Sequence, residues 1–335
     1  MKISRLLALS AALLAAPAAW AQQAPATPAT NEAVRDALAK KDGDVDSTTQ
    51  LKDTLTQVDK QYSLLRKDKV QVNYDLNYSY IGQEKINTDL ASGNATLFSI
   101  ENTSSHTITN TLMVDYGLLN NLTVNAMMPF ISRYSDAAGY SGVSHTVGDV
   151  GVGVRWQPFE VKQDETSFTV TGGVRAATGT SPFKVDAAKG LATGSGFNTV
   201  NLGVNMTRIV DPVALFGSLN LGYSLPARHL SQQLAGAVLK EVKPGPSVGF
   251  GMGFAFALTY KITTSFSFQE SISAKSRLSF DNDRSVRTGT QSAGVLSIGL
   301  GYRVSPKTTL NTTVGIGLTS SAPNMSLGLS LPLAL

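Results

Sequence analysis

The sequence predicts an all-β protein: a transmembrane antiparallel β-barrel of about 12 strands, preceded by a short N-terminal helical or coiled-coil segment. Three observations predict this fold. The chain begins with an export signal, most of the remainder alternates apolar with small or polar side chains, and the connections between these segments are short and long by turns.

The export signal occupies the start of the chain. Lys2 and Arg5 introduce an apolar run, and an Ala-x-Ala site ends at Ala21 ahead of Gln22, so we expect cleavage after Ala21. No later stretch reaches the roughly 20 apolar residues that a membrane helix needs. If the exported chain lives in a membrane, it therefore has to do so as a barrel.

Composition limits the remaining functions. The chain has no cysteine, which excludes disulfide bonds, a thiol nucleophile and a thiolate metal site. It carries 28 Lys and Arg against 24 Asp and Glu, and loss of the two signal cations leaves 26 against 24. This balance gives no argument for a nucleic-acid partner. We expect a signal over 1–21, a periplasmic linker and helical segment over 22–68 and an outer-membrane barrel over 69–335.

The residues from Glu32 to Lys67 are rich in helix formers. An apolar stripe with spacings of four, three, four and three runs through the second half of this segment: Leu51, Leu55, Val58, Tyr62 and Leu65. This is heptad spacing over only about two heptads, so a coiled coil and an amphipathic helix packed on its own domain both fit. We expect the stripe to gate the lumen or to join protomers, with a passive tether as the alternative.

From Lys69 onward the period of the apolar residues changes to two, which is typical of strands. Segments of roughly ten residues, the length that crosses a bilayer at a tilt, follow one another to the end of the chain. The predicted strands are Lys69–Ile81, His106–Tyr116, Leu122–Ser132, Val150–Gln157, Ser167–Ala177, Phe197–Thr207, Val213–Leu225, Ser247–Tyr260, Thr263–Ala274, Ser292–Arg303, Thr308–Thr319 and Asn324–Leu335.

The connections support an outer-membrane barrel independently. Those after the even-numbered strands are short, as in "GLLNN" and "SPKT", and those after the odd-numbered strands are mostly long and polar. The long ones are Gly82–Ser105, Arg133–Gly148, Thr178–Gly196, Pro226–Gly245 and Lys275–Gln291. Short periplasmic turns and long extracellular loops are the outer-membrane pattern, and they place both ends of the barrel in the periplasm.

A soluble β-sandwich or lipocalin-like barrel also has alternating strands, but its apolar face would point inward and need bulky partners. Here the opposite face is small or hydroxyl-bearing, as in Gly249, Gly251 and Gly253. Aromatic residues at strand ends fit an interfacial girdle. They are Tyr116, Phe130, Trp156, Tyr223, Tyr260 and Tyr302.

No set of residues predicts catalysis. The three histidines, His106, His145 and His229, lie in or beside predicted outer loops, and they have no metal-ligand spacing and no aligned acid or nucleophile. "GFGMGF" at Gly249 lies inside a strand rather than before a helix, which argues against a phosphate loop. We therefore expect neither enzymatic activity nor a cofactor or metal.

Charged residues on the polar face of the strands are the candidate functional groups. Period two assigns five of them to the lumen: Asp75, Asp115, Arg155, Arg175 and Arg303. Such groups either tune what passes or serve only as solvated wall residues. Glu270 breaks the pattern because parity places it on the lipid face, and a bulge, a subunit contact or a position near the outer interface could each explain it.

Two segments carry a family resemblance. "VDYGLLNNLTVNAMMPF" (Val114–Phe130) and "VGDVGVGVRWQPF" (Val147–Phe159) have a Tyr-Gly turn, a strand ending in Pro-Phe, and a Gly-Asp before a Gly-alternating strand. This pattern resembles the outer-membrane channels associated with phenol meta-cleavage pathways. The resemblance implies a channel in the bacterial outer membrane that takes up small, aromatic solutes.

The organisation of the chain has a second resemblance. A coiled-coil segment before a barrel of about 12 strands is similar to FapF, the trimeric exporter of functional-amyloid subunits. That likeness implies an exported polypeptide as partner and a homotrimer. The leading hypothesis is a channel for small solutes through a polar lumen, with polypeptide export as the alternative and a structural or adhesive barrel behind both.

Overall fold

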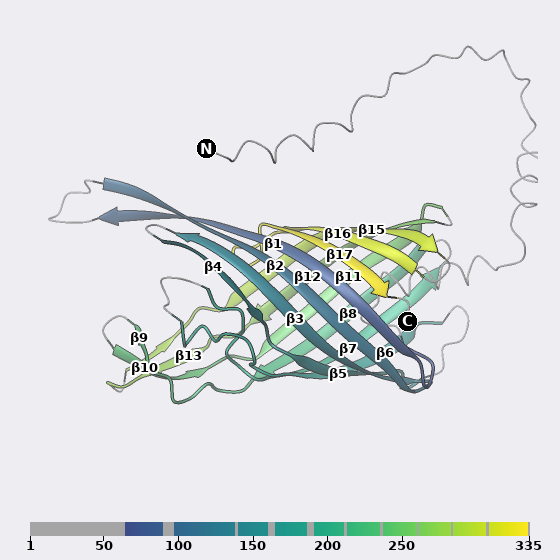
Figure 1. Cartoon of the computed structure of the whole chain (residues 1–335), viewed down its shortest axis with the longest axis horizontal. Helices are drawn as coiled ribbons and strands as arrows, with labels where there is room; N and C mark the ends of the chain where they lie inside the picture. The colour runs from purple at the N-terminus through teal and green to yellow at the C-terminus, as the bar shows by residue number, and fades with distance from the viewer. Residues whose placement is uncertain are drawn as a thin grey trace, which may run out of the picture. The chain divides into compact units, whose positions relative to one another are not determined.

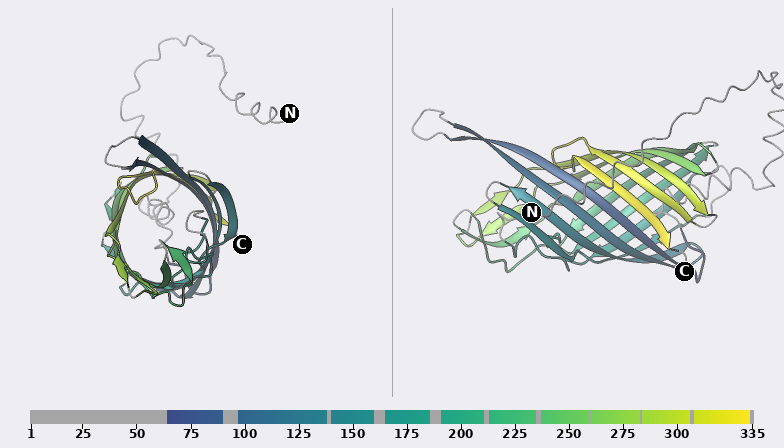
Figure 2. Two further views of the ribbon diagram at one scale, coloured as in Figure 1. Left: turned by 90° about the vertical axis from the view of Figure 1, so that its left-hand side faces the viewer. Right: turned by 45° about the horizontal axis from the view of Figure 1, so that its top comes forward.

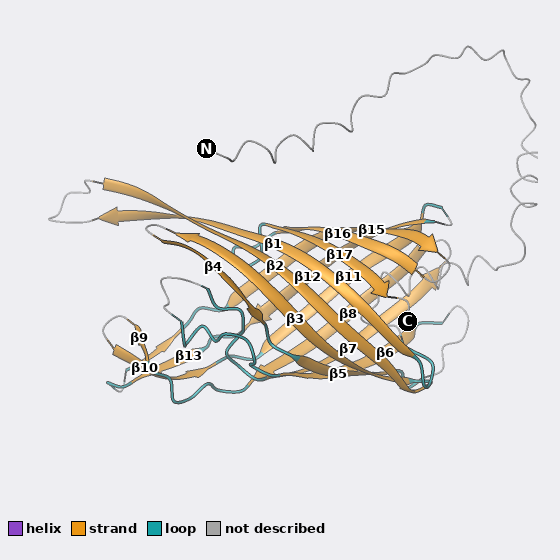
Figure 3. Ribbon diagram, viewed as in Figure 1, coloured by secondary structure: helices purple, strands orange, loops and turns teal. Residues whose placement is uncertain are grey.

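The computed structural model describes residues 64–89, 97–137, 140–159, 165–185, 191–210, 213–234, 237–259, 261–282, 284–305 and 308–333. These residues form a closed antiparallel barrel of twelve strand positions, with strands that run obliquely around it (Figure 1). Within these ranges no helix is long and apolar enough to cross a membrane. Figure 3 shows the dominance of strands and loops in this part of the chain.

The barrel strands follow one another in the sequence order that was predicted. They are β1 (Val70–Asp89), β2 (Leu97–Leu119), β3 (Leu122–Ala137), β5 (Gly151–Trp156), β6 (Ser167–Arg175), β7 (Thr199–Val210), β8 (Val213–Ser224), β11 (Ser247–Ala257), β12 (Ile262–Ser273), β15 (Gln291–Ser305), β16 (Thr308–Gly317) and β17 (Met325–Leu333). All twelve predicted strands are confirmed, although their ends differ.

Pairing of the first and last strands closes the barrel. β1 pairs with β17 from Val72↔Leu333 to Tyr80↔Met325, while β1 pairs with β2 and β2 with β3 on its other side. The view along the barrel shows the resulting ring (Figure 2). Closure leaves no free edge among these twelve positions, as a membrane barrel requires.

One barrel position is built from two strands. The second half of β3, from Phe130, pairs with β4 (Tyr140–Val147), and its first half, up to Met127, pairs with β5. Gly148, Asp149 and Val150 interrupt the strand between them. At this break the Gly148 N–H still donates to the Pro129 carbonyl at 2.8 Å, so the ladder continues past the interruption.

Several segments that were predicted as loops contain strands, so the prediction is wrong there. β1 and β2 continue their pairing through the predicted loop Gly82–Ser105 as far as Asp89↔Leu97. The end of β3 and all of β4 fall within Arg133–Gly148. Both faces of a ladder beyond the membrane meet water, so these extensions need no strict apolar alternation.

Two of the three other long connections form a separate four-stranded sheet. It contains β9 (Gln232–Leu234), β10 (Ala237–Lys243), β13 (Arg277–Phe280) and β14 (Ser285–Arg287). These strands fall in the predicted loops Pro226–Gly245 and Lys275–Gln291. Their pairing joins residues about 40 positions apart, such as Leu239↔Phe280, which no local pattern predicts.

The two faces of the barrel wall differ as predicted. Large apolar side chains of alternate positions are exposed on the outer face, for example Leu202, Leu219, Met252 and Ile298. Most of the intervening positions are small or polar and point inward. A wall that exposes leucine outward and serine or glycine inward suits lipid outside and water inside.

The aromatic residues predicted at the strand ends lie on the outer face. Tyr116, Phe130, Trp156, Tyr223 and Tyr302 are all exposed there, at 40–56% of their surface. Tyr260 lies outside the described residues. Amphipathic rings at this position favour the boundary between hydrocarbon and headgroups.

The predicted helical segment lies almost entirely outside the described residues, as do Leu51, Leu55, Val58 and Tyr62. Its last four residues, 64–67, are not helical, so the prediction is wrong there. The Leu65 N–H donates to Thr123 Oγ1 at 2.9 Å and the Lys67 N–H to Asn120 Oδ1 at 3.1 Å. These barrel side chains take the N–H groups that a helix would have used.

The two faces of β15 give a direct test of this arrangement. Ile298 lies at the middle of the strand and is half exposed on the outer face, whereas Ser297 points inward. Replacing Ile298 by Arg should lower the free energy of unfolding in lipid vesicles by about 2–4 kcal/mol, because a cation then enters hydrocarbon. Urea titration monitored by tryptophan fluorescence measures this change.

Ser297→Arg is the matched control, because the same side chain then projects into the lumen. It should cost much less than Ile298→Arg. Equal losses for the two variants would contradict the assignment of the two faces.

Candidate functional site: the inner face of the barrel

The candidate site is the inner wall, because it carries the charged side chains and the hollows of the barrel. Glycine, serine, threonine and asparagine dominate it. The buried polar residues on it include Asn73, Thr123, Thr169, Asn205 and Thr263, each at most 6% exposed. Hydroxyl and amide groups both donate and accept hydrogen bonds, so a wall built largely from them suits polar passage.

Two of the predicted lumen residues form a buried ion pair. Arg155 Nη2 on β5 contacts Asp115 Oδ1 on β2, with β3 between them. The two side chains are 6% and 4% exposed. Asn73 Nδ2 on β1 donates to the second carboxylate oxygen, Asp115 Oδ2, at 2.9 Å. The pair thus ties together side chains from β1, β2 and β5 on the inner wall.

The other three predicted lumen residues stand apart from this pair. Asp75 lies on the inward parity of β1, between Thr111 and Ser330. Arg175 ends β6 opposite Gly151 and Thr199, beside the interruption between β4 and β5. Arg303 lies at a β-bulge near the other end of the barrel. These three charges are therefore spread over the height of the wall.

A long connection folds against the inner wall and is held there by Asp149. Asp149 Oδ2 accepts hydrogen bonds from the Ser195 N–H at 2.8 Å and from Ser195 Oγ at 2.6 Å. Its Oδ1 accepts from the Gly179 N–H at 3.1 Å. An added Cβ at Gly179 or Gly194 would clash with the other glycine, so both positions require glycine for close approach. We call the described residues 176–185 and 191–198 the clamped loop.

Inward side chains of β3 and β4 make further contacts with the clamped loop. Arg133 Nη1 donates to the Ala192 carbonyl at 2.7 Å, and Thr146 Oγ1 lies 2.5 Å from Thr193 Oγ1. Ala192 and Thr193 are themselves buried. The prediction of a loop at Thr178–Gly196 agrees with its described residues, which form no strand before Thr199, and these residues lie against the inner wall.

A tight turn precedes β1 at the end of the barrel opposite the clamped loop. The Asp68 N–H donates to the Gly117 carbonyl at 2.8 Å, and the Gly117 N–H donates to the Lys69 carbonyl at 2.9 Å. A side chain at Gly117 would collide with the Arg66 carbonyl. The turn therefore holds Leu65 beside Thr123, a fully buried residue of the inner wall.

Glu270 lies in regular pairing, opposite Phe250 and Gly294, so the suggestion of a bulge is wrong. Its carboxylate accepts a hydrogen bond from Ser292 Oγ. An added Cβ at Gly294 would clash with the carboxylate, so the glycine makes room for it. Glu270 lies three residues before the end of β12, on the side of the long connections, which fits a position near the outer interface.

His106 and His145 make contacts with side chains of neighbouring residues on the barrel strands. His106 contacts the ring of Tyr80 with centroids 4.9 Å apart and shares a 2.8 Å hydrogen bond with Tyr78. His145 shares a 2.8 Å hydrogen bond with Ser132. Over the described ranges, no three His, Cys, Asp or Glu residues are grouped as metal ligands.

Sequence reasoning missed four residues of the inner wall. Arg133 was assigned to a loop, and Asp149 was part of a family motif without a role of its own. Their hydrogen-bond partners, Ala192 and Ser195, lie 59 and 46 residues away in the sequence. Phe216 and Asn205 were readable from the parity of their strands. Asn205 is 2% exposed, and neither of its amide atoms has a hydrogen-bond partner among the described residues, which suits a water-filled site.

Comparison with known proteins identifies the family. The family model described as "Putative MetA-pathway of phenol degradation" matches residues 91–334, which is 244 of the 335 residues. Among solved structures, the COG4313 outer membrane channel from Pseudomonas putida F1 superposes with a TM-score of 0.60 at 13% identity. The alignment covers 81% of this chain and 97% of that channel, and it shows a common fold.

Two further structures match less well. The translocator domain of the autotransporter NalP from Neisseria meningitidis has a TM-score of 0.47 at 13% identity, covering 87% of this chain and 98% of that one. The TodX deltaS2S3 mutant monoaromatic hydrocarbon channel has a TM-score of 0.42 at 9% identity, covering 79% and 89%. Neither similarity is high enough to support a conclusion.

The buried ion pair predicts a specific stability change. Asp115→Ala leaves Arg155 as a buried charge without its carboxylate and should lower the free energy of unfolding by about 3–5 kcal/mol. The double variant Asp115→Leu with Arg155→Met removes both charges and should recover most of that loss. Urea unfolding in vesicles compares the two. A double variant less stable than Asp115→Ala would contradict the proposed cause.

Proposed function

The chain belongs to the phenol-degradation family identified above, and we propose that it is an outer-membrane channel that passes small solutes through its lumen by diffusion. The observation that carries the proposal is the inner wall. Its small and hydroxyl-bearing side chains offer water and solute hydrogen bonds, while the outer face is apolar. The long connections then face the cell exterior and the short turns the periplasm.

The charged residues of the wall support selection by charge. Inward strand positions with described side chains carry Arg133, Arg155, Arg175 and Arg303 against Asp75 and Asp115. A lumen with an excess of cationic side chains attracts anions and repels cations. The proposed channel therefore favours neutral and anionic solutes.

The clamped loop supports selection by size. Its contacts with Arg133, Thr146 and Asp149 hold its described residues against the inner wall, where they occupy part of the lumen. A narrowed lumen favours small molecules over an extended polypeptide. Export of a polypeptide and assembly as a homotrimer stay predictions from the organisation of the sequence.

Purified protein in a planar bilayer should give discrete conductance steps. Asp149→Ala removes three hydrogen bonds from the clamped loop and should raise single-channel conductance and increase current fluctuation. The control is Asp136→Ala, which removes an exposed carboxylate next to the end of β3, outside the contacts with the clamped loop. A protein silent under all voltages would overturn the proposed function, and unchanged conductance in Asp149→Ala would overturn the role of the clamp.

The segment before the barrel should also affect the conductance, at the periplasmic end of the lumen. We propose that residues 22–63 sit at the periplasmic mouth, because the turn at Leu64–Lys69 directs the chain to the inner wall at Thr123. Deleting 22–63 leaves that turn intact and should raise conductance while the barrel stays heat-modifiable on gels. Unchanged conductance and unchanged oligomeric state would make the segment a passive tether.

A further inference from the structure

A row of three cations crosses the small sheet of β9, β10, β13 and β14. Lys243 on β10 pairs directly with Arg277 on β13, and Arg277 pairs with Arg287 on β14. Directly opposite residues of an antiparallel ladder share one face, and all three of these side chains are exposed. Like charges in this arrangement repel one another and destabilise the sheet. We call these three residues the cationic row.

The acidic residue on the same face, Glu241, leaves most of this charge uncompensated. Its carboxylate forms a 2.9 Å ion pair with Arg228 and lies 3.6 Å from Lys243 Nζ. The hydrogen bond from Arg228 lowers the pKa of the Glu241 carboxyl, so the carboxylate is already engaged as an anion. Among the described residues, no carboxylate forms an ion pair with Arg277 or Arg287. The row therefore presents unpaired guanidinium groups to its surroundings.

The small sheet continues the barrel wall beyond β11 and β12. Its strand order, β9, β10, β13 and β14, follows the order of the barrel strands to which these segments connect, β8, β11, β12 and β15. Lys243 and Arg277 each lie four residues beyond the pair Ser247↔Ser273, which ends the β11–β12 ladder. Figure 1 shows β10 and β13 at the end of the barrel from which β1 and β2 project.

One face of the small sheet is turned toward the clamped loop. Gln232 on β9 pairs with Leu239 on β10, so their side chains share a face. Gln232 Nε2 donates to the carbonyls of Pro182 and Val185 at 3.0 and 2.8 Å. Both carbonyls belong to the clamped loop, which lies against the inner wall. Leu239 is only 1% exposed, as expected for a side chain covered from that direction.

The cationic row occupies the opposite face. Phe280 on β13 also pairs with Leu239 and therefore shares the covered face, as does Leu278 two residues before it. Arg277 alternates with these residues and points to the other side of the strand. Since the covered face is turned toward the clamped loop inside the barrel, the cationic row is turned away from the lumen.

The row lies close to the lipid headgroups. Tyr223 of the aromatic girdle follows Gly222, which pairs with Ser247 at the end of β11. Four strand residues separate Ser247 from Lys243 and span about 13 Å, which the tilt of a barrel strand reduces to roughly 10 Å along the membrane normal. Long cationic side chains reach several ångströms from the backbone to meet headgroups at such an interface.

We propose that the cationic row binds the phosphate groups of lipopolysaccharide in the outer leaflet beside the barrel. The inference rests on the proposed orientation of the channel, with its long connections at the cell exterior. Arg binds phosphate through parallel N–H donors, and Lys adds a compact charge. A phosphate on the row offsets the repulsion between its three cations. The lipid would thereby also steady the small sheet, which contacts the clamped loop through Gln232.

Titration of the full barrel in detergent with fluorescent diphosphoryl lipid A tests this proposal, with EDTA present to remove bridging metal ions. Arg277→Gln should raise the dissociation constant about five-fold, since one basic side chain near an anionic surface contributes about 1 kcal/mol. Replacement of all three residues of the row by Gln should raise it about a hundred-fold. Arg277→Lys keeps the charge and should lose less affinity than Arg277→Gln.

Arg208→Gln is the matched control, because Arg208 is an exposed arginine at the opposite end of the barrel, beside the short turn between β7 and β8. It should bind lipid A like the unmodified protein. Equal affinities of the triple variant and the unmodified protein would overturn the lipid site. Lipid A should also stay bound in millimolar inorganic phosphate. Its displacement there would reveal a site for free anions and would overturn lipid as the occupant.

Conductance in a phosphatidylcholine bilayer, which contains no lipopolysaccharide, separates this site from the channel function. Discrete steps in the triple variant together with weakened lipid A binding would support both proposals. Discrete steps with unchanged lipid A binding would reject the cationic row alone. Lipid A affinities in the expected order without steps in any variant would reject the channel alone.

Discussion

In the hydrocarbon of a bilayer, a backbone N–H or C=O without a partner costs several kcal/mol, so every strand needs a neighbour on both sides. In this chain the requirement is met at the seam between β1 and β17, where nine residue pairs join the first strand to the last. The seam depends on parity, because Val72 and Leu333 both point outward and Asn73 faces Pro332 inside. A shift of one residue would turn the apolar face of the last strand into the lumen. The other strands inherit their inward and outward faces from this register.

The registers of the strands also decide which polar side chains meet. Asp115 and Arg155 belong to strands separated by β3, and they meet because both are inward and their pairing partners on β3, Asn125 and Thr123, lie two residues apart. Thr123 is fully buried between these charges and the turn that carries Leu65. Asp149 lies on the same wall, in the interruption between β4 and β5. Its carboxylate there accepts hydrogen bonds from Ser195 and Gly179 of the clamped loop.

The barrel could be predicted from the sequence because an outer leucine and an inner serine repeat every second residue over most of the chain. Where this contrast ends, prediction failed: β4 and the four-stranded sheet were taken as loops, since strands with water on both faces carry no such signal. Leu64–Lys67 was predicted as helix from apolar spacing, but barrel side chains compete for its N–H groups. Parity assigned five charged residues to one face, namely Asp75, Asp115, Arg155, Arg175 and Arg303. It could not show that Asp115 and Arg155 pair, because that contact depends on the register of β2 and β5 against β3.

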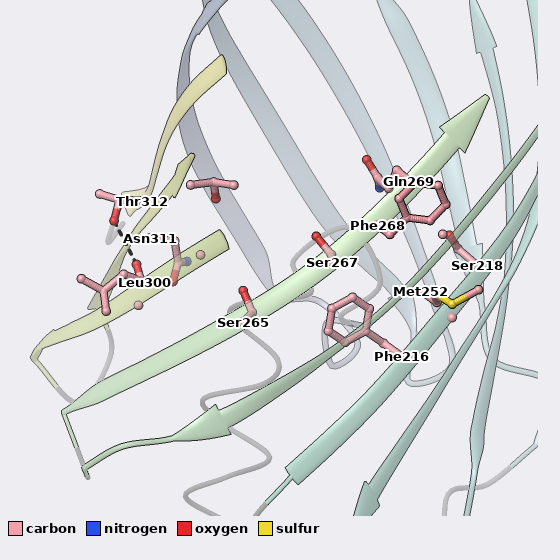
Figure 4. A pocket seen from close by; sticks show the side chains of 15 residues that line it. Phe216, Ser218, Met252, Ser265, Ser267, Phe268, Gln269, Leu300, Asn311 and Thr312 are labelled. Atoms are coloured by element: carbon pink, nitrogen blue, oxygen red, sulfur yellow. Dashed lines mark hydrogen bonds between the residues drawn. The ribbon is translucent and has the colours of Figure 1, made fainter. Parts of the chain in front are cut away.

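One rule recurs across the wall and explains how it keeps its shape with so many glycines. A glycine in one strand is covered by the side chain directly across from it: Phe216 over Gly253, Asn220 over Gly203, and Glu270 beside Gly294. Glycine in a strand weakens the ladder by roughly 0.5–1 kcal/mol, and contact with the opposing side chain offsets part of that cost. On the inner face this arrangement lays side chains along the wall instead of across the lumen. The barrel can then carry the Phe216 ring in its interior and still leave beside it an open hollow of about 170 Å³ lined in part by Gly251, Gly299 and Gly301 (Figure 4).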